Sequence, residues 1–350
     1  MSDVTEHPRL LRLAALTTGG GRRVRRLVAA AASPLSLEGL AGAGAPAAWL
    51  DDVERQFRHA APTVLERAAA VGWRWIVPGD DDWPGILDQT PDPPMGLFVR
   101  GRLGAPPVAA AIVGSRRATT YGLRTAHRLG SGVAGAGGVV VSGMARGVDG
   151  AAHRGALEAG GRTWAVWGAG PDRPYPAEHR RLAEAIAEQG ALITEYPPGA
   201  PPRAGHFPER NRLIAGLVPV VVVVQAAARS GAMATARLAL DQDRDVMAVP
   251  GNIDHELSVG PNGLLRAGAI PCTMPADLLE HIGLESAEGT VADEPDSAVF
   301  RAIPGDRPIT PDELCAETGC AMGEIQTELF RLEIDGAIVR RNDGRVERRR

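Results

Sequence analysis

Short apolar runs alternate with helical patterns through the middle of the chain. The apolar runs cover residues 108–113, 139–141, 163–166, 191–194, 218–224, 246–249 and 269–272. Apolar residues recur at helical spacing between these runs, at 121–133, 150–157, 177–188, 209–217, 232–240 and 275–282. Runs that are continuously apolar, such as 218–224, are typical of parallel strands covered on both faces. The alternation therefore predicts an α/β domain over 108–283, built on a doubly wound, mostly parallel sheet.

The first 71 residues follow a helical pattern instead. Leu10, Leu13 and Leu16 precede the glycine run 19–21, and a further helix is expected from Trp49 to Val71. This pattern predicts a small helical domain over residues 1–71. A helix, a glycine turn and an arginine-rich helix in this order are similar to the helix-hairpin-helix and SAM-like modules that bind nucleic acids.

Three further segments lie outside these two domains. Residues 72–107 are rich in Pro and Asp and are interpreted as a connecting segment with a short strand at Leu97–Val99. Residues 284–297 contain acidic residues and no basic ones, which predicts a flexible linker. Residues 298–350 contain a helix with a capping box at Thr310–Glu313, a second helix and a hairpin, which together predict a winged helix.

The composition excludes several classes of protein. Hydrophobic residues make up 44% of the chain and charged residues 23%, as in soluble globular proteins. No apolar run approaches the ~20 residues of a membrane span, and the N-terminal residues lack the apolar core of a secretory signal. The three cysteines have neither metal-site nor disulfide spacing. These observations predict a cytoplasmic protein without membrane contact, and no metal or cofactor is expected.

Charge is distributed unevenly, although the net charge is only −4. Residues 93–148 contain no Asp or Glu, but they carry Arg100, Arg102, Arg116, Arg117, Arg124, Arg128 and Arg146. This segment predicts a local positive field and hence an anionic partner. The chain has no lysine, so a phosphate-binding lysine of the Walker type is excluded and ATP hydrolysis is not expected.

Two glycine- and arginine-bearing loops lie in the acid-free region, each directly after a predicted strand. The first is Gly114-Ser115-Arg116-Arg117, and the second runs from Ser142 to Asp149. Glycine allows backbone N–H groups to approach an anion, Ser115 can donate to a phosphate oxygen, and arginine makes forked contacts. Asp149 is expected to cap the following helix. The glycine cluster 130–135 has the letters of a dinucleotide fingerprint but ends a helix, so it is rejected as a binding site.

A third loop places arginines at the start of a helix. Arg210 and Arg212 follow Phe207, and two cations at a helix N-terminus oppose the helix dipole unless an anion or an acid compensates them. An anionic ligand is one such compensating group. Glu195 and Glu209 are the competing internal partners, so one of the two arginines can have a structural role.

All of these loops are expected to meet at the carboxyl ends of the parallel strands, where ligands bind. The scarce aromatic residues Tyr175, Tyr196 and Phe207 fall in loops at the same edge, where each can stack on a base or pack internally. The inferred ligand is a chain of phosphates, and no catalytic set of residues is predicted. The predicted DNA- or phosphate-binding residues are Gly114, Ser115, Arg116, Arg117, Ser142, Gly143, Arg146, Gly147, Phe207, Arg210, Asn211, Arg212, Ser230, Gly231 and Thr235.

Several motifs in order resemble those of the DprA/Smf family of DNA-processing proteins. They are Ile112–Arg116, Ser142–Asp149 with His153, Tyr175-Pro176, Phe207–Leu217, Ser230-Gly231 with Thr235-Ala236, and Ala248–Asn252. The helical N-terminus and the winged helix fit the three-part organisation of this family. Gln225, which stands where the family pattern predicts Glu, and the absence of lysine are departures from it.

The resemblance implies a Rossmann-like domain that binds single-stranded DNA. It also implies a homodimer that helps to load the RecA recombinase and displaces single-strand binding protein, either in transformation or in general recombination and repair. In this family the Gly-Ser-Arg loop and a neighbouring basic pocket hold the DNA. These roles map onto Gly114, Ser115 and Arg116, and for the basic pocket onto Arg146, Arg210 and Arg212.

Two other functions remain open from the sequence. A nucleotide-processing hydrolase with a related Rossmann-like fold would use Glu195, Glu209 or Asp149 as its general acid or base. An adaptor would bind proteins through a sheet edge and the winged helix, and the loops would then be structural. The second helix of the winged helix has an acidic outer face, which predicts a protein contact or only a weak DNA contact through the wing.

Overall fold

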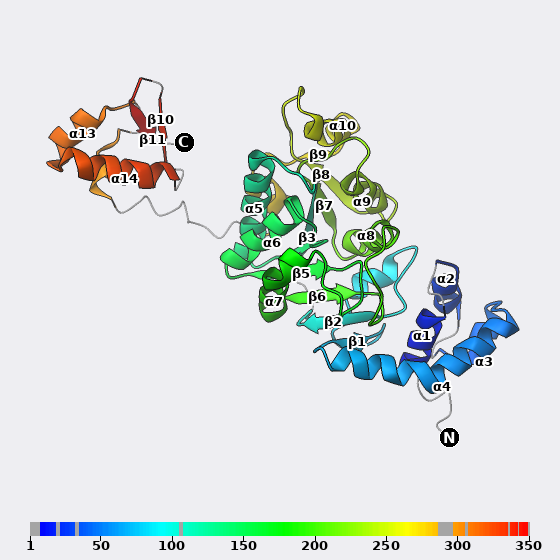
Figure 1. Ribbon diagram of the computed structural model, residues 1–350. Coiled ribbons are helices and arrows are strands. Elements are labelled where there is room, and N and C mark those ends of the chain that lie inside the picture. Colours follow the sequence, from blue (N-terminus) through cyan, green and yellow to red (C-terminus); the bar gives the residue numbers. More distant parts are fainter. Residues whose placement is uncertain are drawn as a thin grey trace. The chain divides into compact units, whose positions relative to one another are not determined.

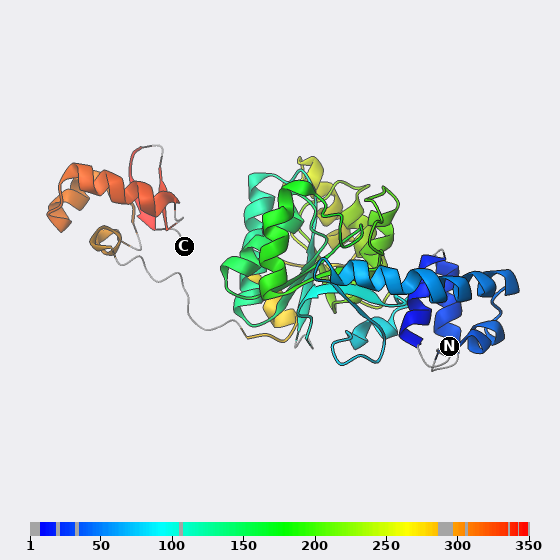
Figure 2. The same cartoon turned by 60° about the horizontal axis from the view of Figure 1, so that its bottom comes forward.

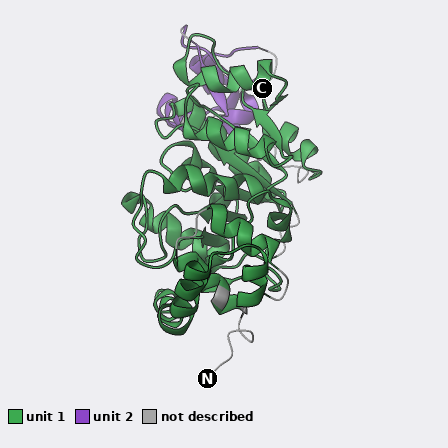
Figure 3. Ribbon diagram, turned by 90° about the vertical axis from the view of Figure 1, so that its right-hand side faces the viewer, with its two compact units in different colours: residues 1–286 green, residues 287–350 purple. Residues whose placement is uncertain are grey.

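The computed structural model describes residues 8–18, 22–31, 35–104, 108–285, 297–304, 307–334, 337–341 and 343–348. The chain forms two compact units, residues 1–286 and 287–350 (Figure 3). Each unit has a hydrophobic core of its own, and the two are described separately. The glycine run 19–21 and most of the expected linker 284–297 lie outside the described residues.

The larger unit is built on a sheet that has nine strands among the described residues. The strands are β1 (Arg74–Ile76), β2 (Leu97–Gly101), β3 (Ala109–Val113), β4 (Val139–Ser142), β5 (Arg162–Val166), β6 (Ala191–Thr194), β7 (Val220–Val223), β8 (Asp245–Ala248) and β9 (Ile270–Pro271). Their spatial order is β1-β2-β6-β5-β4-β3-β7-β8-β9. All neighbours from β6 to β9 are parallel, and β2 runs antiparallel to both of its neighbours. The predicted Rossmann-like, doubly wound sheet is confirmed.

Helices cover both faces of this sheet (Figure 1). One face carries α5 (Thr120–Gly135), α6 (Val148–Glu158), α7 (Arg180–Gln189) and α11 (Pro275–His281). The other face carries α8 (His206–Gly216), α9 (Gly231–Leu240) and α10 (Val259–Arg266). Val220 and Val222 of β7 pack in the α5 layer, whereas Val221 and Val223 pack in the α8 and α9 layer. This burial on both sides explains why the strands are continuously apolar.

The N-terminal helices share a core with one edge of the sheet. They are α1 (Pro8–Thr17), α2 (Arg22–Ala30), α3 (Leu37–Gly42) and α4 (Ala47–Ala69). Leu13 and Phe57 belong to the same buried cluster as Trp75 of β1 and Phe98 of β2, whose ring centres lie 4.7 Å apart. Figure 2 shows this blue helical layer beside the edge formed by β1 and β2. The N-terminal helices and this edge of the sheet therefore share one hydrophobic core within the larger unit.

Four short elements are not apparent in the sequence pattern: β1, α3, α10 and α12 (Ala298–Ala302). Each is too short to display a clear period, and α10 contains Gly260, Pro261 and Gly263, which ordinarily interrupt helices. The helix α8 also begins earlier than predicted, at His206 rather than near Glu209. Pro208 is tolerated there because the first turn of a helix does not need its missing N–H group.

The smaller unit has the elements of a winged helix. They are α12 (Ala298–Ala302), α13 (Pro311–Thr318), α14 (Met322–Ile334), β10 (Ile338–Arg340) and β11 (Val346–Arg348). Thr310 accepts a hydrogen bond from the backbone of Glu313, and the Glu313 carboxylate accepts one from the backbone of Thr310 at 2.8 Å. The predicted capping box is therefore confirmed. In neither unit is any described helix long and apolar enough to cross a membrane.

Candidate functional site

The strand order reverses between β3 and β7, which are adjacent in the sheet. The chain passes from β3 through β4 and β5 to β6 on one side of β3, and then crosses to β7, β8 and β9 on the other side. The loops after β3 and β7 therefore diverge and leave a crevice, which is where open α/β sheets bind ligands. Gln225 ties these loops together, because its backbone oxygen accepts from Ser115 at 2.6 Å and its side-chain oxygen from the Thr119 backbone at 2.9 Å.

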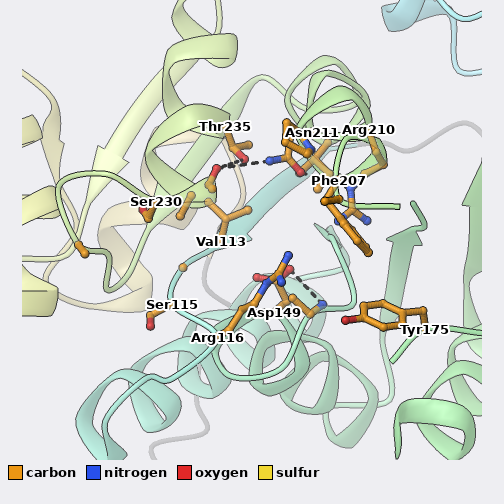
Figure 4. A pocket seen from close by; sticks show the side chains of 18 of the residues that line it. Val113, Ser115, Arg116, Asp149, Tyr175, Phe207, Arg210, Asn211, Ser230 and Thr235 are labelled. Carbon is orange, nitrogen blue, oxygen red and sulfur yellow. Dashed lines mark hydrogen bonds between the residues drawn. The ribbon is translucent and has the colours of Figure 1, made fainter. Parts of the chain in front are cut away.

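A pocket of about 610 Å³ lies at this crevice (Figure 4). The predicted residues that line it are Gly114, Ser115, Arg116, Phe207, Arg210, Asn211, Ser230, Gly231 and Thr235. Figure 4 shows Ser115 and Arg116 on one side of the pocket and Phe207, Arg210 and Asn211 on the opposite side. The loops that the sequence singled out thus converge on one pocket.

Two helix N-termini line this pocket. α8 contributes Phe207 and Pro208 from its first turn, and α9 begins at Gly231, directly after its N-cap residue Ser230. The Ser230 hydroxyl accepts from the backbone of Met233 at 3.3 Å, and the other first-turn N–H groups of α9 have no acceptor within the helix. Such N–H groups and the positive end of a helix dipole stabilise a bound anion.

Arg116 extends along the pocket from the loop after β3. Its guanidinium carbon lies 5.3 Å from the centre of the Phe207 ring, which is a cation–π contact. Within the described part of the chain, no carboxylate lies within 4.0 Å of this guanidinium, so its charge is available to an anion. Arg117 is exposed as well, but it lines only a smaller neighbouring pocket.

The smaller pocket has a volume of about 170 Å³ and shares Arg116, Tyr175 and Phe207 with the larger one. It brings together three other predicted residues, Arg117, Gly143 and Arg146. Tyr175 is 44% exposed, and its ring centre lies 5.3 Å from that of Phe207. Arg146 forms an exposed ion pair with Glu178, with which a bound anion would have to compete.

Asp149 lines the larger pocket although it is only 6% exposed. Its Oδ2 accepts hydrogen bonds from the backbone of Gly143 at 3.1 Å and of Ala145 at 3.3 Å. The carboxylate therefore supports the loop before α6, and the prediction that it caps α6 is wrong, because Gly147 is the N-cap residue. Burial raises the pKa of Asp149 to about 6, although the Arg210 charge and these hydrogen bonds act in the opposite direction.

Arg210 lines both pockets but is itself only 5% exposed. Its Nη1 donates to the backbone oxygen of Gly143 at 3.0 Å and also to that of Val166. Burial lowers the pKa of Arg210 to about 10, so the group remains charged at neutral pH. Arg210 therefore supplies positive charge to the pocket while it connects the loop after β4 to the end of β5.

The remaining predicted residues lie outside the linings of both pockets. Arg212 is 7% exposed, and its guanidinium pairs with Glu195, the internal partner that the sequence had offered as an alternative. Ser142 is fully buried and donates to a backbone oxygen of β3 at 2.7 Å. Gly147 has a φ of +74°, and a Cβ there would lie 2.2 Å from a backbone oxygen of the loop after β3. These three residues support the loops instead of facing a ligand.

The acids suggested for a nucleotide-processing reaction are dispersed. Glu195 is buried against Arg212, and Glu209 pairs with Arg25 at 2.9 Å, so of the three suggested acids Asp149 alone lines the pocket. In the ranges that the structure describes, no group of three His, Cys, Asp or Glu side chains is placed to hold a metal ion.

Sequence reasoning missed part of the pocket lining. Pro202, Ala204, Ala227 and Leu257 complete the wall between the predicted residues. They are apolar residues of loops and short turns, and nothing in their chemical type indicates a ligand. Only their position in the folded chain identifies them.

Two family models match the chain. One, described as DNA recombination-mediator protein A, matches residues 74–283, and the other, described as DprA winged helix domain, matches residues 285–344. The chain belongs to the DNA recombination-mediator protein A family. The first match includes β1 and β2, which therefore belong to the DprA family domain, and the second confirms the predicted winged helix.

Relatives in the DprA family resemble this chain over most of its length. Protein Smf of Escherichia coli (strain K12) is 40% identical over 293 residues, which cover 79% of this chain and 78% of the relative. The putative DNA processing protein DprA of Mycobacterium tuberculosis (strain H37Rv) is 39% identical over 305 residues, with 80% and 78% covered.

Solved DprA structures have the same fold. The X-ray structure of DNA processing protein A from Streptococcus pneumoniae matches with a TM-score of 0.70 and 30% identity, covering 81% of this chain and 100% of that one. A structure of DNA processing protein A from Helicobacter pylori, which describes a single-stranded DNA binding mode, matches with a TM-score of 0.55 and 30% identity. It covers 60% of this chain and 96% of its own.

Proposed function

We propose that this protein binds single-stranded DNA in the pocket between the β3 and β7 loops and acts, without catalysis, as a recombination mediator. The observation that carries the proposal is the Arg116 guanidinium, which lies in the same pocket as the N-termini of α8 and α9 and has no carboxylate within 4.0 Å among the described residues. Together these groups favour phosphates. The DprA family membership and the binding mode described for the Helicobacter pylori relative support the same function.

The pocket also has the features that favour a single strand over a duplex. Phe207 and Tyr175 lie beside Arg116, and both rings can stack on unpaired bases. In a duplex the base faces are already stacked, so the rings would gain no such contact. We assign phosphate contacts first to Gly114, Ser115, Arg116, Ser230 and Gly231, and additional positive charge to Arg117, Arg146 and Arg210.

The finer part of the proposal concerns what happens to the bound strand. The family resemblance supports a homodimer in the cytoplasm that protects single-stranded DNA, displaces single-strand binding protein and helps to load the RecA recombinase. A pocket that binds phosphates and stacks bases without a catalytic pair is suited to holding a strand intact.

Titration of a fluorescent ~30-nucleotide single strand and of the matching duplex, at several salt concentrations, tests the proposal. The single strand is expected to bind more tightly, with a slope of log affinity against log salt of about −0.7 per phosphate contacted. Arg116→Ala should weaken binding about tenfold, because a charge-assisted hydrogen bond is lost, and should reduce the slope by about 0.7.

Arg117→Ala is the matched control, because it removes the same charge from the neighbouring residue. Its effect is expected to be smaller, since Arg117 does not line the larger pocket. If the wild-type protein does not bind the single strand, or if both variants lose affinity equally without a change in slope, the assignment of the pocket is wrong.

A further inference from the structure

Arg25 of the N-terminal helix α2 is buried against α8. Its side chain is 3% exposed, and Nε and Nη2 donate to the two carboxylate oxygens of Asp92, both at 2.8 Å. Its Nη1 donates to Glu209 of α8 at 2.9 Å. Arginine is almost never fully buried unless it is paired. Arg25 therefore joins the N-terminal helical layer to the segment before β2 by a forked pair of charge-assisted hydrogen bonds and to α8 by a single one, through Glu209.

The same cluster fixes α8 at two further points. Arg212 pairs with Glu195, which follows β6, and its Nη1 donates to the backbone oxygen of Asp92 at 2.8 Å. The Tyr196 hydroxyl donates to Glu209 at 3.3 Å and is also 3.2 Å from the backbone oxygen of the first residue of α8. Both the beginning and the middle of α8 are thus anchored to loops of the sheet.

The charges of the cluster reinforce one another. Burial lowers the pKa of Arg25, but the hydrogen bonds of Asp92 and Glu209 and the charge of Glu195 outweigh this effect and raise it above its ordinary value. Burial alone would raise the pKa of Asp92, but Arg25 and Arg212 lower it. Arg25 and Asp92 therefore remain charged at neutral pH.

The helix α8 carries these anchors and the pocket residues on opposite faces. Phe207 and Arg210 line the pocket, whereas Glu209 and Arg212 contact the cluster. Residues three apart share a helix face, while residues two apart do not. A small rotation of α8 about its axis would therefore change the anchors and the pocket wall at the same time.

We infer that Arg25 is a positioning residue for the pocket. It holds the face of α8 that carries Glu209 and Arg212, and in this way the N-terminal helical layer determines the positions of Phe207 and Arg210 on the opposite face. The inference rests on the proposed single-stranded DNA binding. Because coupling between two sites is reciprocal, DNA in the pocket would also strengthen the contact between α2 and α8.

The test compares Arg25→Ala with Arg22→Ala in the full-length protein. Arg22 is the matched control, since it lies in the same helix, is 68% exposed and only approaches Asp92, at 3.8 Å. Arg25→Ala is expected to weaken binding of the ~30-nucleotide single strand about tenfold, a size typical of residues that act without touching the ligand. The salt slope should stay unchanged, because Arg25 would contact no phosphate.

Hydrogen–deuterium exchange without DNA is the second measurement. Residues 206–216 should exchange faster in Arg25→Ala than in the wild type, and Arg22→Ala should match the wild type. Arg25→Lys keeps the charge but cannot make the same fork, so it should bind the strand with intermediate affinity. If Arg25→Ala does not fold, Arg25→Lys replaces it in both measurements.

The possible outcomes distinguish the proposed DNA binding from the positioning role of Arg25. A wild-type protein that does not bind the strand would refute the proposed function, and the exchange of residues 206–216 would then decide the positioning role alone. Wild-type affinity in Arg25→Ala, an equal loss in Arg22→Ala, or a slope reduced by about 0.7 would overturn the positioning role.

Discussion

Asp149 places an acidic group in a pocket that is proposed to bind phosphates. The carboxyl group is held by two backbone N–H groups of the loop before α6, and its neighbours include the charges of Arg210 and Arg116. When it is ionised it repels a phosphate in the pocket, and when it is protonated it does not. Because burial raises its pKa to about 6, the switch between these states occurs in an accessible pH range.

We expect single-stranded DNA binding to weaken as the pH rises through about 6, the pKa of Asp149. Bound phosphates favour the protonated carboxyl group, so binding takes up protons and affinity is highest below this pH. At an effective dielectric constant of about 20, two unit charges ~8 Å apart repel each other by about 2 kcal/mol, so ionisation of Asp149 should lower the affinity by up to about thirtyfold. Titrations between pH 5 and pH 8 at constant ionic strength measure it.

Asp149→Asn isolates this effect. The amide cannot ionise, so the variant should keep its affinity through the same pH range. An unchanged pH dependence in Asp149→Asn would assign the effect to another group.

At single positions, the sequence identifies candidate residues and their order along the chain, but it does not identify the side chains with which they pair in the folded protein. Arg116 could be chosen because it follows a strand in a stretch without acids. Arg212 has the same side chain, but it turns inward to Glu195, which lies 17 residues earlier, just after the end of β6. Asp149 satisfies the loop before it rather than its own helix. These choices depend on which loops the sheet brings together, and local spacing does not contain that information.

At the scale of elements, α8 is held by a buried ion pair between Arg212 and Glu195, and the loss of either partner should strongly lower the free energy of unfolding. Arg212 and Glu195 are each 7% exposed at the side chain, and burial raises the pKa of Glu195 against the effect of Arg212. Removing Arg212 would leave Glu195 in a poorly hydrated site with only the Arg25 charge, 4.0 Å away, to compensate it.

Arg212→Ala should therefore lower the free energy of unfolding by about 3 kcal/mol. The loss should be larger at pH 8 than at pH 5, because Glu195 without Arg212 keeps only the Arg25 charge, 4.0 Å away, and its burial then favours the protonated form. Urea denaturation at both pH values measures the effect. Arg58→Ala, which breaks an exposed pair with Glu54 in α4, is the control and should cost less than about 1 kcal/mol. Equal losses in the two variants would contradict the structural role of Arg212.

The elements themselves are predictable where burial on both faces leaves a continuous apolar run, as in β3 and β7. β1 is different, because its three residues pair antiparallel with β2 and gain their stability from Trp75 packing on Phe98. Such a strand depends on contacts distant in sequence, so neither period nor length identifies it. The same holds for the hydrogen bond between Arg25 and Glu209 that anchors α8, because it joins residues 184 positions apart.

At the scale of the whole molecule, α14 and the hairpin of the smaller unit offer DNA less uncompensated positive charge than the proposed DNA-binding pocket of the larger unit does. The outer surface of α14 presents Phe330, 64% exposed, and Met322, 40% exposed, together with the exposed Glu324. A recognition helix that binds DNA presents cations to phosphates instead. In the adjoining hairpin, Arg341 pairs with Glu347, and Arg340 lies 3.5 Å from Glu333 of α14, so these charges are partly neutralised within the unit.

Deletion of residues 287–350 should therefore leave single-stranded DNA binding nearly intact. The remaining unit keeps its own core and both pockets, so we expect its affinity to stay within about twofold of the full chain and its salt slope to be unchanged. The isolated segment 287–350 should bind no more tightly than ~100 µM, the weak end of non-specific binding. The same fluorescence titration measures all three proteins. A loss of tenfold or more on deletion, with a smaller salt slope, would mean that the winged helix contacts phosphates through its wing.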